Sequence, residues 1–173
     1  MKLRTKLLGA LGVAVLGIGT ALAQGVIYQF PNAPWQAFAP TRIQCGILKG
    51  ANFNITTDQA IPISVPSATY LFDSIEISSP SVSLTTAAGG FYTAVSKGGV
   101  AVVASSQAYS ALTTNAVNTT GNALLATIAT AGNTTRFQGP SQSSPITTLY
   151  LSLTTGQGAA ATANVRVFCR TSY

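Results

Sequence analysis

Few residues in this chain of 173 could carry out catalysis. It has no histidine, which removes the commonest general base and the commonest transition-metal ligand. Its only acidic residues are Asp58, Asp73 and Glu76. Glycoside hydrolysis needs two carboxyl groups that flank the scissile bond, about 5–10 Å apart. Asp73 and Glu76 stand three positions apart, so on an unbroken strand their side chains point to opposite faces of the sheet. We therefore expect no enzyme.

The same set of residue types predicts that the chain binds no metal ion and no cofactor. Asp58 and Asp73 together with backbone oxygens could bind Ca²⁺, but the chain contains no EF-hand loop pattern. If both cysteines are paired, no plausible zinc ligands are left. The glycine-rich segments Ala87–Gly90 and Lys97–Gly99 lack the phosphate-binding P-loop pattern, so we interpret both as turns.

The two cysteines, Cys45 and Cys169, are predicted to form a disulfide. An even number of cysteines in an exported chain is typical of such a bond, and two buried free thiols are the alternative. Each cysteine is in phase with apolar residues along its predicted strand, which directs both sulfur atoms into the core. These in-phase sets are Ile43, Cys45 and Ile47 on one strand, and Val165, Val167 and Cys169 on the other.

Asp73 is the most unusual residue in the pattern. It is in phase with Leu71, Ile75 and Ile77, so an unbroken strand would direct its carboxylate inward. A buried carboxylate has to be paired or neutralised. Either an arginine pairs with Asp73 or a β-bulge turns the side chain outward, and we prefer both explanations to a functional site.

Residues 1–23 have the pattern of a cleaved signal peptide. Three basic residues within the first six positions precede the apolar run Leu7–Ala21, and Ala21-Leu22-Ala23 matches a cleavage site before Gln24. An uncleaved membrane anchor is the alternative, but the apolar run is short and is diluted by four glycines. We expect a secreted, periplasmic or cell-surface protein with no membrane span after cleavage.

The charge of the chain argues against a nucleic-acid partner. Nine basic and three acidic residues give a net charge of +6, and loss of the basic leader residues reduces it to +3. The remaining positive charges are scattered along the sequence, whereas a nucleic-acid binder carries a basic stripe interleaved with aromatics. Only 7% of the residues are charged, against about 25% in typical domains. Serine, threonine, asparagine and glutamine supply the polarity instead, as in extracellular β-proteins.

Residues 41–173 are predicted to form a single antiparallel β-sandwich of jelly-roll-like type. Short β-branched and aromatic runs alternate with glycine, proline, asparagine and serine clusters at the spacing of such folds. Paired glycines in Lys97–Gly99 supply the positive φ of a tight hairpin, and Ser105–Leu112 forms the one helical turn. The predicted strands are Val26–Phe30, Thr41–Leu48, Ala51–Thr56, Ile61–Val65, Tyr70–Ile77, Ser81–Thr86, Gly90–Val95, Val100–Ala104, Leu124–Thr130, Thr147–Thr154 and Asn164–Arg170.

Two further segments have a distinct pattern. Residues 24–40 combine three prolines with Trp35 and Phe38, which predicts an irregular aromatic arm. This arm could be a binding loop, but we favour a plug for one end of the core because large aromatic side chains are usually buried. The segment Ser83–Gly89 recurs in part as Ser152–Gly158, either at equivalent places in two sheets or by convergence in a chain rich in small residues.

From Tyr70 to Phe168 the chain resembles a group of uncharacterised small β-sandwich proteins of bacterial and phage genomes. The resemblance implies the fold but no activity and no site residues. The chain differs from the group in its export signal, its N-terminal arm and its cysteine pair. The matching segments are Val82–Ala94 (VSLTTAAGGFYTA), Ser96–Gly99 (SKGG), Gln107–Leu112 (QAYSAL) and Leu149–Ala163 (LYLSLTTGQGAAATA).

Taken together, these features predict a non-catalytic exported protein with a structural or surface-interaction role. A cell-surface protein, a glycan or a second copy of the chain would be its partner. A phage-like virion or decoration component that acquired export is one alternative. A carbohydrate-binding module is another, with Trp35, Tyr92 and Tyr109 as candidate aromatics for stacking on sugar rings.

Overall fold

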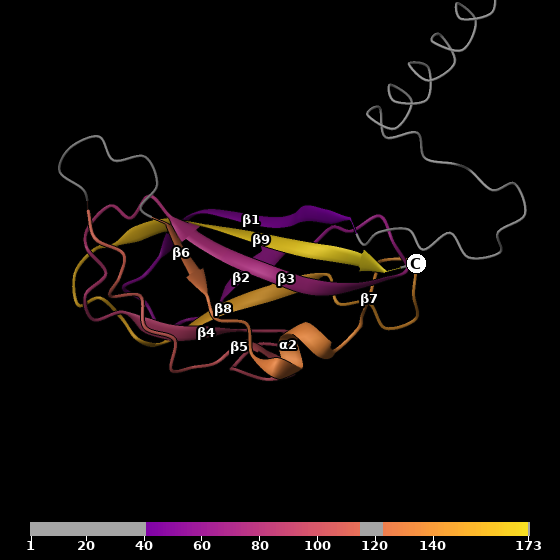
Figure 1. The fold of residues 1–173 in the computed structure, drawn as a ribbon. Coiled ribbons are helices and arrows are strands. Elements are labelled where there is room, and N and C mark those ends of the chain that lie inside the picture. Colours follow the sequence, from indigo (N-terminus) through magenta and orange to yellow (C-terminus); the bar gives the residue numbers. More distant parts are fainter. Residues whose placement is uncertain (1–40, 115–122, 173) are drawn as a thin grey trace, which may run out of the picture. The chain divides into compact units, whose positions relative to one another are not determined.

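A computed structural model describes residues 41–114 and 123–172 of the chain. The predicted signal peptide, the aromatic arm with Trp35 and the predicted strand Val26–Phe30 lie outside the described residues. Within them, the chain forms two antiparallel sheets (Figure 1). The first sheet has the strand order β1-β9-β3-β6, with β7 also paired to β3, and the second has the order β2-β8-β4-β5.

The expectation of an all-β protein is confirmed. The single described helix, α2, is one short turn of chain at Thr130–Thr134. The strands are β1 (Arg42–Asn52), β2 (Gln59–Pro62), β3 (Thr69–Ser78), β4 (Ala88–Tyr92), β5 (Ala101–Val103), β6 (Ala123–Ala126), β7 (Phe137–Gln138), β8 (Thr148–Thr155) and β9 (Thr162–Ser172).

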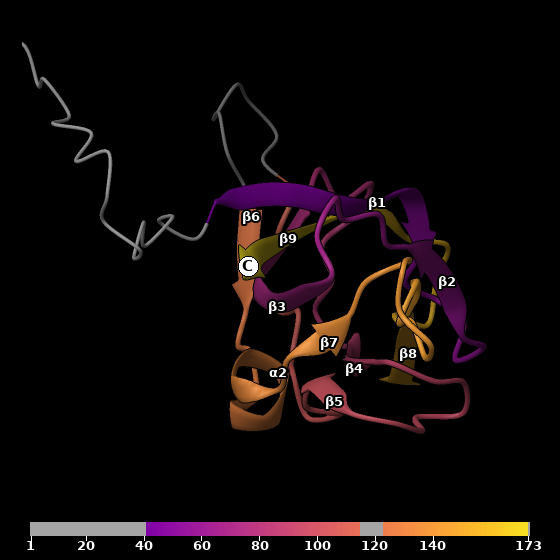
Figure 2. The same ribbon diagram turned by 90° about the vertical axis from the view of Figure 1, so that its right-hand side faces the viewer.

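The ribbons of the two sheets lie as two layers (Figure 1 and Figure 2). Apolar side chains from both sheets belong to one buried core. The strand β8 contributes Leu149, Leu151 and Leu153, which are fully buried in the predicted alternation. In the first sheet, the buried rings of Tyr70 and Phe72 pack edge to face, with 5.4 Å between their centroids. At one edge the layers meet, where the amide of Ser64 donates to the carbonyl of Cys45 at 2.8 Å.

The strand β1 departs from the predicted alternation. It is one strand where the sequence predicted two, and its pairing with β9 shifts register between Gln44 and Gly46 and again between Leu48 and Ala51. A bulge of this kind rotates the following side chains to the opposite face. The prediction that Ile47 faces the core is therefore wrong: Ile47 is 39% exposed, and Leu48 packs against the core instead.

Several predicted boundaries are also corrected. Ser81–Thr86 forms no strand, and Ser105–Leu112 contains two turns around an isolated bridge at Ala108 instead of a helical turn. The two copies of the partial repeat are therefore not equivalent, because Ser152 lies within β8. They contact each other instead: the Thr86 hydroxyl donates to the carbonyl of Gln157 at 2.9 Å.

The glycines also differ from their predicted roles. Gly89 and Gly90 lie within β4, where a Cβ atom would overlap the backbone of Leu153 in β8 and of Val103 in β5. They therefore permit close strand approach and do not form a turn. In the β4–β5 hairpin, positive φ occurs at Ser96, Lys97 and Gly99 and not at Gly98, so the prediction of paired left-handed glycines is wrong in detail.

A disulfide joins Cys45 in β1 to Cys169 in β9. Both cysteines are buried, their Cα atoms are 5.7 Å apart, and 124 positions separate them in the sequence. In the chain-entropy description, a cross-link that closes so long a loop stabilises the fold mainly by restricting the unfolded chain.

Replacing both cysteines with alanine is expected to lower the free energy of unfolding by about 2–5 kcal/mol, because the unfolded chain regains the entropy of the open loop. Denaturant titration with and without a reducing agent measures the effect. The reducing agent should bring the parent protein to the midpoint of the variant and leave the variant unchanged. Equal stability of the oxidised parent and the variant would contradict the role given to the bond.

Candidate functional site

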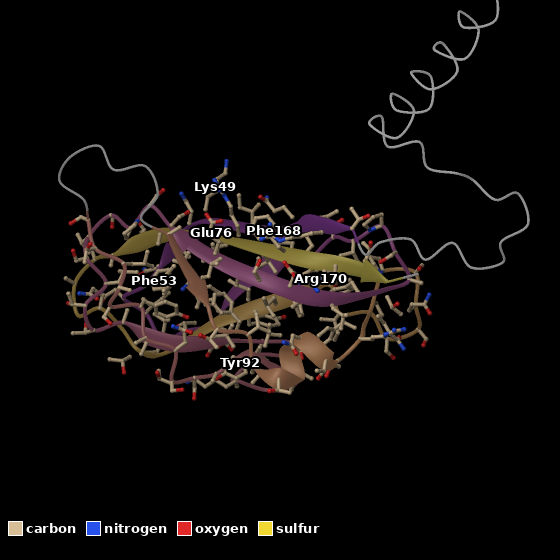
Figure 3. The ribbon with its side chains drawn as sticks, viewed as in Figure 1. Lys49, Phe53, Glu76, Tyr92, Phe168 and Arg170 are labelled. Atoms are coloured by element: carbon tan, nitrogen blue, oxygen red, sulfur yellow. A yellow bond between two sulfur atoms is a disulfide. The ribbon has the colours of Figure 1, made fainter. Side chains whose placement is uncertain are left out.

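The outer face of the first sheet carries most of the charge of the described residues. Along β9, Arg166, Phe168 and Arg170 point outward because they alternate with the buried Val165, Val167 and Cys169. Figure 3 shows Phe168 and Arg170 on this sheet, with Glu76 and Lys49 beside them. We call this surface the arginine face and define it by Arg42, Lys49, Asp73, Glu76, Arg166, Phe168 and Arg170.

The pairing of three strands, β1, β9 and β3, brings these side chains together. Directly paired residues of an antiparallel sheet lie on the same face, so the register gives the neighbours across the strands. One row crosses these three strands and β6, and two shorter rows cross the three strands alone. The rows are Ile47, Arg166, Glu76 and Leu125; Gln44, Phe168 and Ser74; and Arg42, Arg170 and Leu71.

Asp73 is held between two arginines at the centre of this arrangement. The register of β3 against β9 shifts between Phe72 and Ser74, so Asp73 occupies a bulge. The Nε atom of Arg42 lies 2.7 Å from its carboxylate, and the Nε atom of Arg170 contacts the other oxygen. Both explanations that the sequence left open therefore apply: a bulge turns Asp73 outward, and arginines pair with it.

The other contacts of the face leave the cations accessible. The guanidinium of Arg42 lies 4.0 Å from the centroid of the Phe168 ring, in a cation–π arrangement. Arg166 pairs more loosely with Glu76, at 3.5 Å. The side chains of Arg42, Arg166 and Arg170 remain 52%, 47% and 56% exposed.

The expectation that the positive charges are scattered is wrong in three dimensions. Four of the six basic residues in the described part of the chain, Arg42, Lys49, Arg166 and Arg170, share the arginine face with Asp73 and Glu76. The face therefore carries a net charge of +2. The signal was present in the sequence as the alternation of Arg166, Phe168 and Arg170, but the contributions of β1 and β3 depend on pairing that only the fold reveals.

A second polar cluster holds the β4–β5 hairpin. The amide of Ser96 donates to the carboxylate of Asp58, and the hydroxyl of Ser152 forms a further hydrogen bond with it. These two hydrogen bonds, with the nearby charge of Lys97, hold the pKa of Asp58 below its ordinary value of 3.8. Because Ser96 and Lys97 adopt positive φ, Asp58 stabilises a turn that is unfavourable for their residue types.

The candidate sugar-stacking aromatics do not form a site. Tyr92 is 5% exposed and Tyr109 is fully buried, where its hydroxyl donates to the carbonyl of Gly89 at 3.0 Å. Burial also raises the pKa of the Tyr109 hydroxyl. Neither ring is open to a ligand, so these two assignments are wrong, and Trp35 lies outside the described residues.

Within residues 41–114 and 123–172, no group of three or more histidine, cysteine or carboxylate side chains is placed to hold a metal ion. In the same residues, no helix is long and apolar enough to cross a membrane. No protein-family model, curated protein or solved structure matches the chain. Its function has to be argued from its own geometry.

Replacing Asp73 with asparagine is expected to destabilise the protein by about 1–3 kcal/mol, because two neighbouring arginines lose their shared counter-charge. The matched control is Glu76→Gln, which removes a looser and more exposed pair and should cost at most about 1 kcal/mol. Denaturant midpoints at low and at 1 M salt measure both effects. Equal costs for the two variants would contradict the central role of Asp73.

Asp58 is expected to contribute acid sensitivity to the hairpin. Because its pKa is depressed in the folded state, its stabilising contribution is present above the ordinary value of 3.8 and is lost as the pH falls through the folded-state pKa. The amide resonance of Ser96 should therefore titrate with a midpoint below 3.8. It should not titrate in the variant Asp58→Asn, and a midpoint at or above 3.8 in the parent would contradict the assignment.

Proposed function

We propose that the chain is a non-catalytic exported protein with a structural or surface-interaction role, built as a single antiparallel β-sandwich of jelly-roll-like type. The observation that carries the proposal is the buried disulfide between Cys45 and Cys169. Disulfides persist in oxidising compartments and are rare in the cytosol. The disulfide therefore supports export of the protein, which the signal-peptide pattern of residues 1–23 also predicts.

The positions of the carboxylates support a role without catalysis. Asp58 accepts the amide of Ser96, Asp73 is paired with two arginines, and Glu76 faces Arg166. General acid–base catalysis needs a carboxyl group in reach of a substrate proton and of a second catalytic group. In the described residues, each of these three carboxylates has its own structural partner, and no two of them share one. This arrangement favours a scaffold over an active site.

The core supports the sandwich architecture. Apolar side chains from the first and the second sheet belong to one buried cluster, as expected when two sheets pack face to face. The resemblance of Tyr70–Phe168 to small β-sandwich proteins of bacterial and phage genomes agrees with this architecture. A virion component is the weaker alternative, because capsid and tail proteins assemble in the cytoplasm, where a structural disulfide is unexpected.

Purification of the protein from its native envelope or medium tests the proposal. The mature chain is expected to begin at Gln24, and reduction should raise its intact mass by about 2 Da as two thiols replace one S–S bond. Crosslinking in the native envelope should then identify its neighbours. A cytoplasmic protein that retains Met1 and two free thiols would overturn the proposal, and co-purification with phage particles would favour the virion alternative.

A further inference from the structure

We infer that the arginine face binds an acidic polysaccharide, one whose sugars carry carboxylate or sulfate groups. This inference rests on the proposed surface-interaction role and adds a binding surface and a class of ligand to it. It replaces the buried Tyr92 and Tyr109 as the basis for carbohydrate binding.

The first argument is the exposure of arginine hydrogen-bond donors to solvent. An arginine carries five N–H donors in a planar fork that matches carboxylate geometry. Asp73 contacts the Nε atom of Arg170, and Glu76 contacts a terminal nitrogen of Arg166. The side chains of Arg170 and Arg166 are 56% and 47% exposed, so N–H donors of both guanidinium groups face solvent. They lie at an exposed surface with a net charge of +2, which is complementary to a polyanion.

The second argument is preorganisation. Asp73 fixes Arg42 and Arg170 from one side, and the ring of Phe168 supports the guanidinium of Arg42 from below. Side chains that are already fixed lose less conformational entropy when a ligand binds. Phe168 is half-buried and its ring face is covered by the guanidinium of Arg42, so its contribution is to hold that cation in place by a cation–π contact.

The third argument is the spacing of the cations along β9. Arg166 and Arg170 are four residues apart on one strand, which places them about 14 Å from each other at 3.4 Å per residue. Lys49 and Arg42 lie on the neighbouring strand β1. A linear polymer with repeated negative charges can contact several of these positions at once, and each added contact raises the overall affinity.

The composition of the face disfavours other occupants. Two copies of the chain would bring together two surfaces of charge +2, which repel each other. A protein interface has a contiguous apolar centre, whereas the exposed Ile47 and Leu125 lie on β1 and β6, with β9 and β3 between them. At about 4.8 Å between strands, roughly 14 Å of polar surface separates the two side chains.

The test is binding of the purified, processed protein to polygalacturonate and to sulfated dextran, measured by calorimetry or biosensor at 50 mM and 500 mM salt. Binding is expected at low salt and should weaken strongly at high salt because the charges are exposed. Neutral dextran should not bind. Arg166→Gln should lower the affinity about three- to tenfold, as expected for loss of one exposed charge-assisted contact.

Arg136→Gln is the matched control, because it removes the same charge from an exposed residue outside the face. Its affinity should stay within about twofold of the parent. Phe168→Leu should weaken binding about threefold while thermal unfolding shows an intact fold. Equal losses for Arg166→Gln and Arg136→Gln, or tighter binding to anionic phospholipid vesicles or single-stranded DNA than to polygalacturonate, would overturn the inference.

The outcomes separate this inference from the proposed function. An exported, disulfide-bonded protein that does not bind polygalacturonate or sulfated dextran would overturn the ligand and leave the surface role in place. A cytoplasmic protein with free thiols would overturn the proposed function whatever it binds.

Discussion

The pairing of β9 with β1 on one side and with β3 on the other is the interaction on which the rest of the described structure depends. One side of β9 supplies valines and a cysteine to the core, and the opposite side supplies two arginines and a phenylalanine to the surface. Because successive side chains of a strand alternate between faces, a one-residue slip would exchange the two sets. The disulfide to β1 opposes such a slip, because it holds Cys169 next to Cys45 on the core side of the sheet.

Much of the fold follows from local sequence. The alternation of Leu149, Leu151 and Leu153 correctly predicts a strand with one buried face, and the phases of Cys45 and Cys169 correctly direct both sulfurs inward. The errors occur where tertiary contacts override the local pattern. A bulge turns Ile47 outward, and close approach of β8 and β5 places Gly89 and Gly90 in a strand.

The candidate site was less accessible to sequence analysis. Arg42, Asp73 and Arg170 are distant in the chain, and only the strand order places them side by side. Exposed aromatics were the sequence-based candidates for a ligand, but Tyr109 instead packs edge to face on Phe53, with 5.1 Å between the ring centroids. Aromatic side chains in so small a core contribute mainly to its packing. The surface chemistry of this protein is therefore that of its arginines.

The order of the strands has a kinetic consequence. The first described strand, β1, pairs with the last, β9, and more than a hundred residues separate the two partners. Contacts between such distant segments require closure of a long loop, and proteins dominated by them fold on millisecond to second timescales. During synthesis, β1 has no partner in the first sheet until β9 has been made. The first sheet of this fold is therefore completed only when the last of its described strands has been made.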